Sequence, residues 1–285
     1  MPKHVCAIFG LLFVSMTLAA SAEEPAVTRR AYEVRGVKLY TETFGHGPPV
    51  VFLHGGLHFF DNSFAGQRDY FAAFRTVIGI DQRGHGHSPD NSAPFSYEGM
   101  AADTAALIKQ LGLGPVDVIG HSDGGNVGLL LARDHPELVR RLVISGANIR
   151  ADTAGLSPAE LQQKMQRSPQ EISATLPPTF QTDYSQVSPD GAEHWLTAVE
   201  KSWQLWLTPI VIEPADLKTI RMPALVIAGD HDFTSLEETT EIYRALPRGQ
   251  LMILPATGHA TFKERPELIN AAIRSFLEAP DSVKN

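Results

Sequence analysis

Short, nearly continuous apolar runs recur along most of the chain, and a turn signal or an amphipathic stretch follows each of them. Runs of this kind are typical of strands that are buried on both faces, as in a parallel sheet. They lie at VVFLHG (50–55), FRTVIGID (74–81), VDVIGH (116–121), RLVISG (141–146), ALVIAGD (224–230) and GQLMILP (249–255). We therefore predict that all of these runs form buried strands of one sheet.

Helical patterns occupy most of the intervals between the runs, at 97–111, 126–134, 236–246 and 265–277. Strands that alternate with helices need crossover connections, which place helices on both faces of a parallel sheet. Before the first run, residues 31–45 alternate around Arg35 and Gly36, as a hairpin does. The pattern predicts an α/β fold with a mostly parallel central sheet of about eight strands.

One interval breaks this alternation. Residues 148–216 contain no buried-strand run, and they hold the pair Pro177-Pro178 and the amphipathic stretch 194–207. A structureless loop of that length is uncommon inside a compact domain. We therefore predict a helical cap at 149–216, inserted after the sixth strand into a core formed by 23–148 and 217–285.

The first 22 residues have the composition of a secretory signal peptide. Lys3 supplies a positive charge, residues 5–20 are mostly apolar, and Ala20-Ser21-Ala22 offers a cleavage site of small residues. The apolar part is short for a membrane span, which needs about 20 residues. We predict a secreted or periplasmic protein whose mature chain has no membrane span. Cys6, the single cysteine, lies in this segment, so the mature chain would form no disulfide.

The charge of the chain narrows the class of partner. Its formal net charge is −8, and no cluster of Lys or Arg occurs along it. Nucleic acid and anionic lipid surfaces attract basic patches, so neither is expected as a partner. A neutral or small substrate fits this balance better. The pattern carries no signal for the oligomeric state.

Candidate chemistry gathers where the predicted strands end. Ser122 ends one apolar run, Asp232 and His259 follow two later ones, and Gly55-Gly56 follows the first. Ligands of parallel sheets bind at the carboxyl ends of the strands, which would bring these residues to one edge. The stretch 120–124 reads Gly-His-Ser-Asp-Gly between a predicted strand and a helix. This context is typical of a nucleophile elbow, whose small neighbours permit a sharp backbone turn.

Several motifs taken together resemble the α/β-hydrolase fold family in their residues and in their order. They are HGG (54–56), DQRGHGHS (81–88), GHSDGG (120–125), GDHD (229–232) and GH (258–259). The resemblance covers essentially all of the chain after the predicted signal peptide. It implies a serine enzyme similar to esterases and lipases, with a cap insertion.

The resemblance implies a catalytic triad of Ser122, His259 and Asp232. A serine hydroxyl attacks poorly unless a base removes its proton, and imidazole suits that task, so His259 is the expected general base. In similar enzymes the acid lies two residues past a glycine-acid pair, which favours Asp232 over its neighbour Asp230. An acid after the preceding strand is disfavoured, because residues 145–148 contain no carboxylate.

The family also supplies two backbone N–H groups that stabilise the oxyanion of the tetrahedral intermediate. The resemblance implies Asp123 for one donor and Gly56 for the other, with Leu57 as the alternative to Gly56. The carboxylate of Asp123 is unusual there, since a negative charge beside an oxyanion in a low dielectric costs several kcal/mol. We therefore predict that this side chain turns away from the pocket and is held by donors below the elbow.

Other polar and aromatic residues have simpler interpretations. Histidines crowd the predicted active edge, but His85-x-His87 is a weak metal signal, so we expect no metal and no cofactor. We predict that residues 81–84 form a turn stabilised by the pair of Asp81 and Arg83. Glu98 and Asp103 are predicted on a solvated helix face. The tryptophans of the insertion, Trp195, Trp203 and Trp206, are predicted to form its core, and the alternative is that one of them contacts the substrate.

The serine at the elbow narrows the reaction. Relatives that open epoxides or displace halide carry aspartate there, and those that release N-terminal proline have a proline in the first glycine loop, which 55–58 lacks. Carbon–carbon hydrolases often have tryptophan after the histidine, where this chain has Ala260-Thr261-Phe262. We predict cleavage of a small or aromatic carboxylic ester or lactone. The alternatives are a carbon–carbon bond hydrolase, a cofactor-free haloperoxidase-like enzyme, and a ligand-binding receptor with an intact triad.

Overall fold

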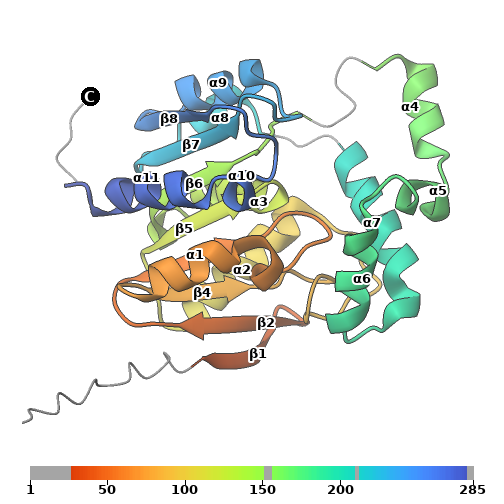
Figure 1. The fold of residues 1–285 in the computed structure, drawn as a ribbon, viewed down its shortest axis with the longest axis horizontal. Coiled ribbons are helices and arrows are strands. Elements are labelled where there is room, and N and C mark those ends of the chain that lie inside the picture. The colour runs from red at the N-terminus through yellow and green to blue at the C-terminus, as the bar shows by residue number, and fades with distance from the viewer. Residues whose placement is uncertain (1–26, 151–155, 209–211, 281–285) are drawn as a thin grey trace, which may run out of the picture.

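A computed structural model describes residues 27–150, 156–208 and 212–280 (Figure 1). Within this part of the chain, eight strands form one sheet in the order β1-β2-β4-β3-β5-β6-β7-β8. The predicted signal peptide, 1–22, lies outside the described residues. The α/β class is confirmed, as is a mostly parallel sheet with helices on both faces.

The strands lie close to where the apolar runs place them. The first two, β1 (Thr28–Val34) and β2 (Val37–Phe44), form an antiparallel hairpin around Arg35 and Gly36, and β2 also pairs antiparallel with β4. The other strands run parallel to one another. They are β3 (Pro49–Leu53), β4 (Thr76–Ile80), β5 (Val116–His121), β6 (Val139–Ser145), β7 (Ala224–Gly229) and β8 (Gly249–Leu254).

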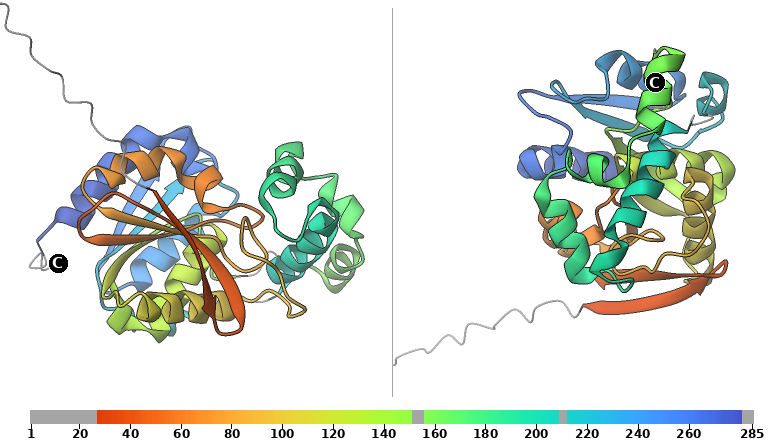
Figure 2. Two further views of the ribbon diagram at one scale, coloured as in Figure 1. Left: turned by 90° about the horizontal axis from the view of Figure 1, so that it is seen from below. Right: turned by 90° about the vertical axis from the view of Figure 1, so that its right-hand side faces the viewer.

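Helices cover both faces of the sheet (Figure 2). One face carries α1 (Phe60–Ala72), α10 (Thr261–Glu264) and α11 (Pro266–Glu278). The other face carries α2 (Tyr97–Gln110), α3 (Asp123–Asp134), α8 (Pro214–Leu217) and α9 (Leu236–Ala245), and a 3-10 turn, η1 (Pro136–Leu138), follows α3. The sequence pattern does not predict α1, because its polar residues blur the periodicity and the backbone kinks at Phe64.

A separate group of helices lies between β6 and β7, beyond one end of the sheet (Figure 1). It consists of α4 (Pro158–Met165), α5 (Pro169–Ser173), α6 (Pro178–Val187), the 3-10 turn η2 (Ala192–His194) and α7 (Trp195–Leu207). We call this group the cap helices. Their apolar residues form a cluster of their own, which includes Leu57 from the loop after β3.

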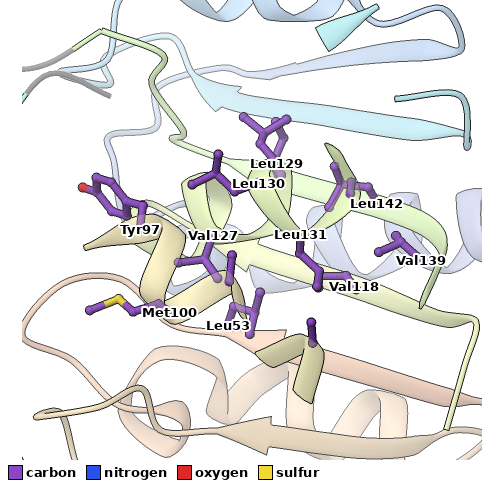
Figure 3. Close-up of a cluster of buried hydrophobic side chains, with 14 of the residues drawn as sticks. Leu53, Tyr97, Met100, Val118, Val127, Leu129, Leu130, Leu131, Val139 and Leu142 are labelled. Carbon is purple, nitrogen blue, oxygen red and sulfur yellow. The ribbon is translucent and has the colours of Figure 1, made fainter. Parts of the chain in front are cut away.

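The core consists of two apolar layers, one on each face of the sheet. Figure 3 shows part of the layer under α2 and α3, where Leu53 and Val118 of the sheet meet Val127 and Leu131 of α3. Burying a large apolar side chain stabilises the fold by roughly 1.5–3 kcal/mol. The long apolar runs of the sheet therefore fix the frame on which the loops at its carboxyl edge are held.

The strand β8 is not buried on both faces, which corrects the prediction from its apolar run. Leu251 is 37% and Ile253 is 38% exposed. The reason is topological, since β8 is the last strand of the sheet and has a neighbour on one side only. An apolar run does not reveal whether its strand is central or at the edge.

The charged residues of α2 and of the loop after β4 have other partners than predicted. Asp103 is fully buried rather than solvated, and its carboxylate accepts hydrogen bonds from the guanidinium groups of Arg35 at 3.1 Å and Arg83 at 2.7 Å. Asp81 therefore does not pair with Arg83. It accepts instead from the backbone N–H groups of Phe60 and His87. Glu98 is exposed on α2, as predicted.

Candidate active site

The junction of β5 and α3 holds Ser122 in a strained conformation. Its backbone has φ 55° and ψ −122°, a positive φ that costs a non-glycine residue about 1–3 kcal/mol. A Cβ at Gly120 would overlap the backbone of Gly124, and one at Gly124 would overlap the carbonyl of Leu53. The glycines around Ser122 therefore allow strand, turn and helix to approach closely. This is the geometry that the elbow motif predicts.

His259 lies in the loop that follows β8, and its ring is oriented by a buried carboxylate. The Nδ1 atom lies 2.7 Å from Oδ1 of Asp232, whose side chain is fully buried. The backbone N–H of Thr234 donates to the same oxygen at 3.0 Å. Nδ1 is therefore the protonated nitrogen, which leaves the lone pair on Nε2 free to accept a proton.

Asp230, the other candidate for the acid, faces a different group. It is exposed, and its carboxylate accepts from the backbone N–H of Thr257 at 3.0 Å. The structure thus brings Asp232 and not Asp230 to His259. The catalytic role of each residue stays a prediction.

Gly146 at the end of β6 is a residue of this site that sequence reasoning missed. A Cβ there would lie 2.6 Å from Cε1 and 2.9 Å from Nδ1 of His259. Its φ is +63°, which glycine adopts without strain. The sequence does carry a signal for Gly146, because it ends a run that predicts a strand at the active edge, where the lack of a side chain leaves room for a neighbouring group.

Ser122 and His259 line one cavity of about 410 Å³ beneath the cap helices. This volume lies in the lower part of the range for small-molecule sites. The walls are mostly aromatic and apolar on the cap side and glycine-rich on the sheet side. The lining residues are Gly55, Gly56, His58, Tyr97, His121, Ser122, Asp123, Gly146, Asn148, Leu176, Pro177, Phe180, Trp203, Trp206, Phe233 and His259.

The two predicted oxyanion donors, Gly56 and Asp123, both belong to this lining. Asp123 is the first residue of α3, where backbone N–H groups have no partner within the helix. Leu57, the alternative to Gly56, has a positive φ of 57° and packs its side chain into the apolar cluster of the cap helices. The assignment of both donors stays a prediction.

The side chain of Asp123 does not turn away below the elbow, which corrects the prediction. It borders the cavity, and its carboxylate accepts from the hydroxyl of Tyr97 at 2.8 Å and from the indole N–H of Trp206 at 3.0 Å. One donor comes from α2 and the other from α7. Burial raises the pKa of this carboxyl, and the two hydrogen bonds oppose that effect.

The histidines near the cavity are held neutral by burial. Burial lowers the pKa of His121 to about 3 and that of His58 to about 4. The Nε2 atom of His121 lies 2.8 Å from the carbonyl oxygen of His259, so this nitrogen carries the proton and donates. The sequence predicts that His121 lies at the active edge, but it does not predict the hydrogen bond to the carbonyl of His259.

The tryptophans of the cap helices divide into two kinds. Trp195 is buried among apolar residues, as predicted for an insertion core. Trp203 and Trp206 are partly buried, and they both pack against this cluster and border the cavity. The amphipathic pattern of 194–207 predicts the helix, but it does not reveal which face covers a pocket.

In the part of the chain that the structure describes, no group of three or more His, Cys, Asp or Glu side chains is arranged to hold a metal ion. His85 and His87 have other partners, since His85 contacts the carbonyl of Arg83 and His87 contacts Asp81. Among the described helices, none is long and apolar enough to cross a membrane.

Comparisons with known proteins agree with this geometry. The model of the alpha/beta hydrolase family matches residues 50–272. The chain is 30% identical to the sn-1-specific diacylglycerol lipase ABHD11 of Mus musculus over 81% of each chain. It is 26% identical to the (E)-2-((N-methylformamido)methylene)succinate hydrolase of Acinetobacter baylyi, over 82% of this chain and 92% of that one.

A solved structure shares the fold. The thermophilic esterase of Thermogutta terrifontis, determined with malate bound, superposes with a TM-score of 0.67 at 25% identity, covering 88% of this chain and 98% of that one. The family match spans most of the described chain, including the strands, the elbow and the histidine loop. The chain therefore belongs to the alpha/beta hydrolase family.

Proposed function

We propose that this chain is an exported serine hydrolase that cleaves a carboxylic ester or lactone of a small or aromatic substrate. The observation that carries the proposal is that one and the same cavity is lined by Ser122, on its strained turn, and by His259, whose ring is oriented by Asp232. A hydroxyl and an imidazole oriented by a carboxylate form the constellation that performs acyl transfer.

The proposed reaction runs in two halves through an acyl-enzyme. Oγ of Ser122 attacks the ester carbonyl while Nε2 of His259 accepts its proton. The tetrahedral intermediate then collapses, the C–O bond to the alcohol breaks, and His259 gives its proton to the leaving alkoxide. In the second half a water molecule loses its proton to His259, attacks the acyl carbonyl and releases the acid, and Ser122 regains its proton.

Backbone donors at the floor of the cavity would stabilise the oxyanion in both halves. We assign this role to the N–H groups of Asp123 and Gly56, which border the cavity on the sheet side. Loss of one such donor typically costs about 3 kcal/mol of transition-state stabilisation. Because only backbone atoms are involved, the role does not depend on the side chain of Asp123.

The size and lining of the cavity support a compact substrate. A volume of about 410 Å³ bordered by Phe180, Trp203 and Trp206 suits a short acyl chain or an aromatic ring. The esterase and lipase activities in the names of the compared proteins support ester chemistry.

Turnover of p-nitrophenyl acetate and p-nitrophenyl butyrate tests the proposal. Ser122→Ala should lose at least 1000-fold in kcat, on the order of the losses seen when a catalytic serine is removed. Ser185→Ala is the control, because its hydroxyl only contacts the carbonyl of Gln181 on the surface of α6. Full activity in Ser122→Ala would contradict the proposal.

A fluorophosphonate probe separates an enzyme from a ligand-binding receptor with the same fold. The probe should label the wild type at Ser122 and leave Ser122→Ala unlabelled. Absence of both labelling and turnover in the wild type would favour the receptor. Export rests on the composition of residues 1–22, and N-terminal sequencing of the exported protein should find Glu23 as its first residue.

A further inference from the structure

The carboxylate of Asp123 joins three elements that are far apart in the sequence. It stands on the first turn of α3 directly after Ser122. It accepts from Tyr97 on α2 at 2.8 Å, and the indole N–H of Trp206 on α7 lies 3.2 Å from one of its oxygens and 3.0 Å from the other. The side chain thus ties a cap helix to the residue beside the proposed nucleophile.

This tie lies directly over the first glycine loop. A Cβ at Gly56 would overlap an oxygen of Asp123 and would lie 2.8 Å from Cζ2 of Trp206. The carboxylate and the indole ring are therefore packed against the backbone of Gly56 without space for another side chain. A shift of Trp206 would open or close the cavity next to a proposed oxyanion donor.

Burial of Asp123 makes the tie costly to break. Asp123 is only 9% exposed, and a buried polar group without a hydrogen-bond partner costs about 1–3 kcal/mol. Removing the carboxylate would leave the indole N–H of Trp206 without this acceptor. Trp206 would then gain by moving toward water or another acceptor, which changes the wall of the cavity.

Other contacts hold the cap helices to the core independently of this tie. The carboxylate of Asp90 accepts from Lys201 at 2.7 Å and pairs with His194 at 2.9 Å, and Asn62 donates to Asp183 at 3.2 Å. Leu57 also packs into the apolar cluster of the cap helices. A change at Asp123 or Trp206 should therefore alter the cavity locally while the cap helices stay docked.

We propose that Asp123 is a specificity-determining residue that acts through Trp206: its carboxylate holds the indole ring as a wall over Gly56 and so limits the size of ester that the cavity accepts. The proposal rests on the ester hydrolysis proposed above. It assigns no chemical step to the carboxylate, which makes Asp123 a positioning residue. The oxygen pair acts as a hydrogen-bond acceptor, and its geometry matters more than its charge.

The two substitutions Asp123→Ala and Asp123→Asn separate geometry from charge. Alanine removes both acceptors. Asparagine keeps one amide oxygen for the indole N–H of Trp206, and its NH2 group can donate to the hydroxyl oxygen of Tyr97, which is able to accept. We expect the alanine variant to release Trp206 and the asparagine variant to hold it.

The first measurement does not depend on turnover. The chain contains three tryptophans, so a 15N-indole spectrum of the intact protein gives three N–H signals, and the Trp206 signal is the one lost in Trp206→Phe. In Asp123→Ala this signal should move, while that of Trp195, whose indole N–H donates to the hydroxyl of Ser173, keeps its position and reports an intact cap. The Trp203 signal should shift less than that of Trp206, since its ring packs edge-on against Trp206 but does not contact Asp123. An unmoved Trp206 signal would overturn the proposal.

The second measurement is a panel of p-nitrophenyl esters from acetate to octanoate. Asp123→Ala and Trp206→Phe should each raise the ratio of kcat/KM for octanoate over acetate about tenfold, which corresponds to about 1.4 kcal/mol. The double variant should show no more than the larger single effect, because both changes remove the same tie. The octanoate-to-acetate ratio of Asp123→Asn should stay within about twofold of the wild-type ratio, because the amide oxygen still accepts from the indole N–H of Trp206.

Trp203→Phe is the matched control on the same helix. Its indole N–H donates to the carbonyl of Lys164 and not to Asp123, although its ring packs edge-on against that of Trp206, with 6.4 Å between the centroids. Its effect on the ratio should therefore be only weakly coupled to that of Asp123→Ala, through this ring contact. Coupling of Trp203 as strong as that of Trp206, or a ratio in Asp123→Asn as high as in Asp123→Ala, would contradict the proposal.

The two proposals fail in different ways. If Ser122→Ala keeps its esterase activity, the proposed function fails, whereas the indole spectrum still tests the tie. If the wild type hydrolyses esters and Ser122→Ala does not, but Asp123→Ala changes neither the spectrum nor the ratio, only the role of Asp123 fails.

Discussion

At Gly146, a hydrogen atom in place of a side chain leaves room for the imidazole ring of His259. The glycines at the elbow do the same for the backbone around Ser122. The side chains with proposed catalytic roles are thus placed by glycines, which have no reactive side chain of their own. A substitution at such a residue changes the position of a neighbour rather than the chemical groups present.

Gly146→Ala should lower kcat about 100-fold with the fold retained, because a displacement of roughly 1 Å at a catalytic group has effects of that size. The new Cβ would lie 2.6 Å from Cε1 of His259, which must shift. Esterase kinetics on the purified variant check this result.

Gly112→Ala is the matched control for the backbone. Its φ of +66° is close to the +63° of Gly146, but a Cβ there meets no atom within 4 Å. It should lower stability slightly and leave kcat unchanged. Equal losses of kcat in both variants would mean that strain, and not contact with His259, is responsible.

At the scale of elements, α2 is bound to the rest of the molecule by the buried carboxylate of Asp103. Arg35 in the β1–β2 turn and Arg83 in the loop after β4 both donate to it. The two arginines differ in exposure, since the side chain of Arg35 is 53% and that of Arg83 is 12% exposed. Water therefore screens the ion pair of Asp103 with Arg35, whereas the ion pair with Arg83 is largely buried.

Asp103→Ala should lower the free energy of unfolding by about 3 kcal/mol or more, because it leaves the largely buried guanidinium of Arg83 without its partner. Arg35→Ala should cost no more than about 1 kcal/mol, since water screens an exposed pair. Urea denaturation of the variants gives both values. A loss in Arg35→Ala as large as in Asp103→Ala would contradict this ranking.

For the whole molecule, buried histidines couple stability to pH. Burial lowers the pKa of His54 to about 3, of His58 to about 4 and of His121 to about 3. Below the ordinary value of about 6.5, the unfolded chain binds protons that the folded chain excludes. The free energy of unfolding should therefore be highest above pH 6.5 and fall as the pH falls.

Each such histidine contributes a loss of about 1.4 kcal/mol per pH unit below its unfolded pKa. His58→Gln should remove one of these contributions, and its amide N–H2 can replace the contact of Nδ1 with the carbonyl of Gly56. Urea denaturation between pH 6 and pH 5 should show a shallower loss in this variant. His46→Gln, at an exposed position, should follow the wild type.

The sequence by itself determined the layers and the place of the site. Apolar runs define strands because a parallel sheet buries both of its faces, and the elbow motif places Ser122 because only small neighbours allow its turn. The order of the apolar runs along the chain was enough to predict that Asp232 and His259 lie at the same edge of the sheet as Ser122, since the carboxyl ends of parallel strands lie at one edge.

Only the tertiary structure decided which long-range partners meet. The sequence could not show that Arg83 pairs with Asp103 rather than with Asp81, or that β8 is an edge strand of the sheet. It also could not show that Trp206 donates a hydrogen bond to Asp123. Such contacts depend on how loops and cap helices pack in space, and no local periodicity records that packing. Side chains at the cavity were thus predictable where the strand pattern fixed their backbone, and unpredictable where a distant element supplied the partner.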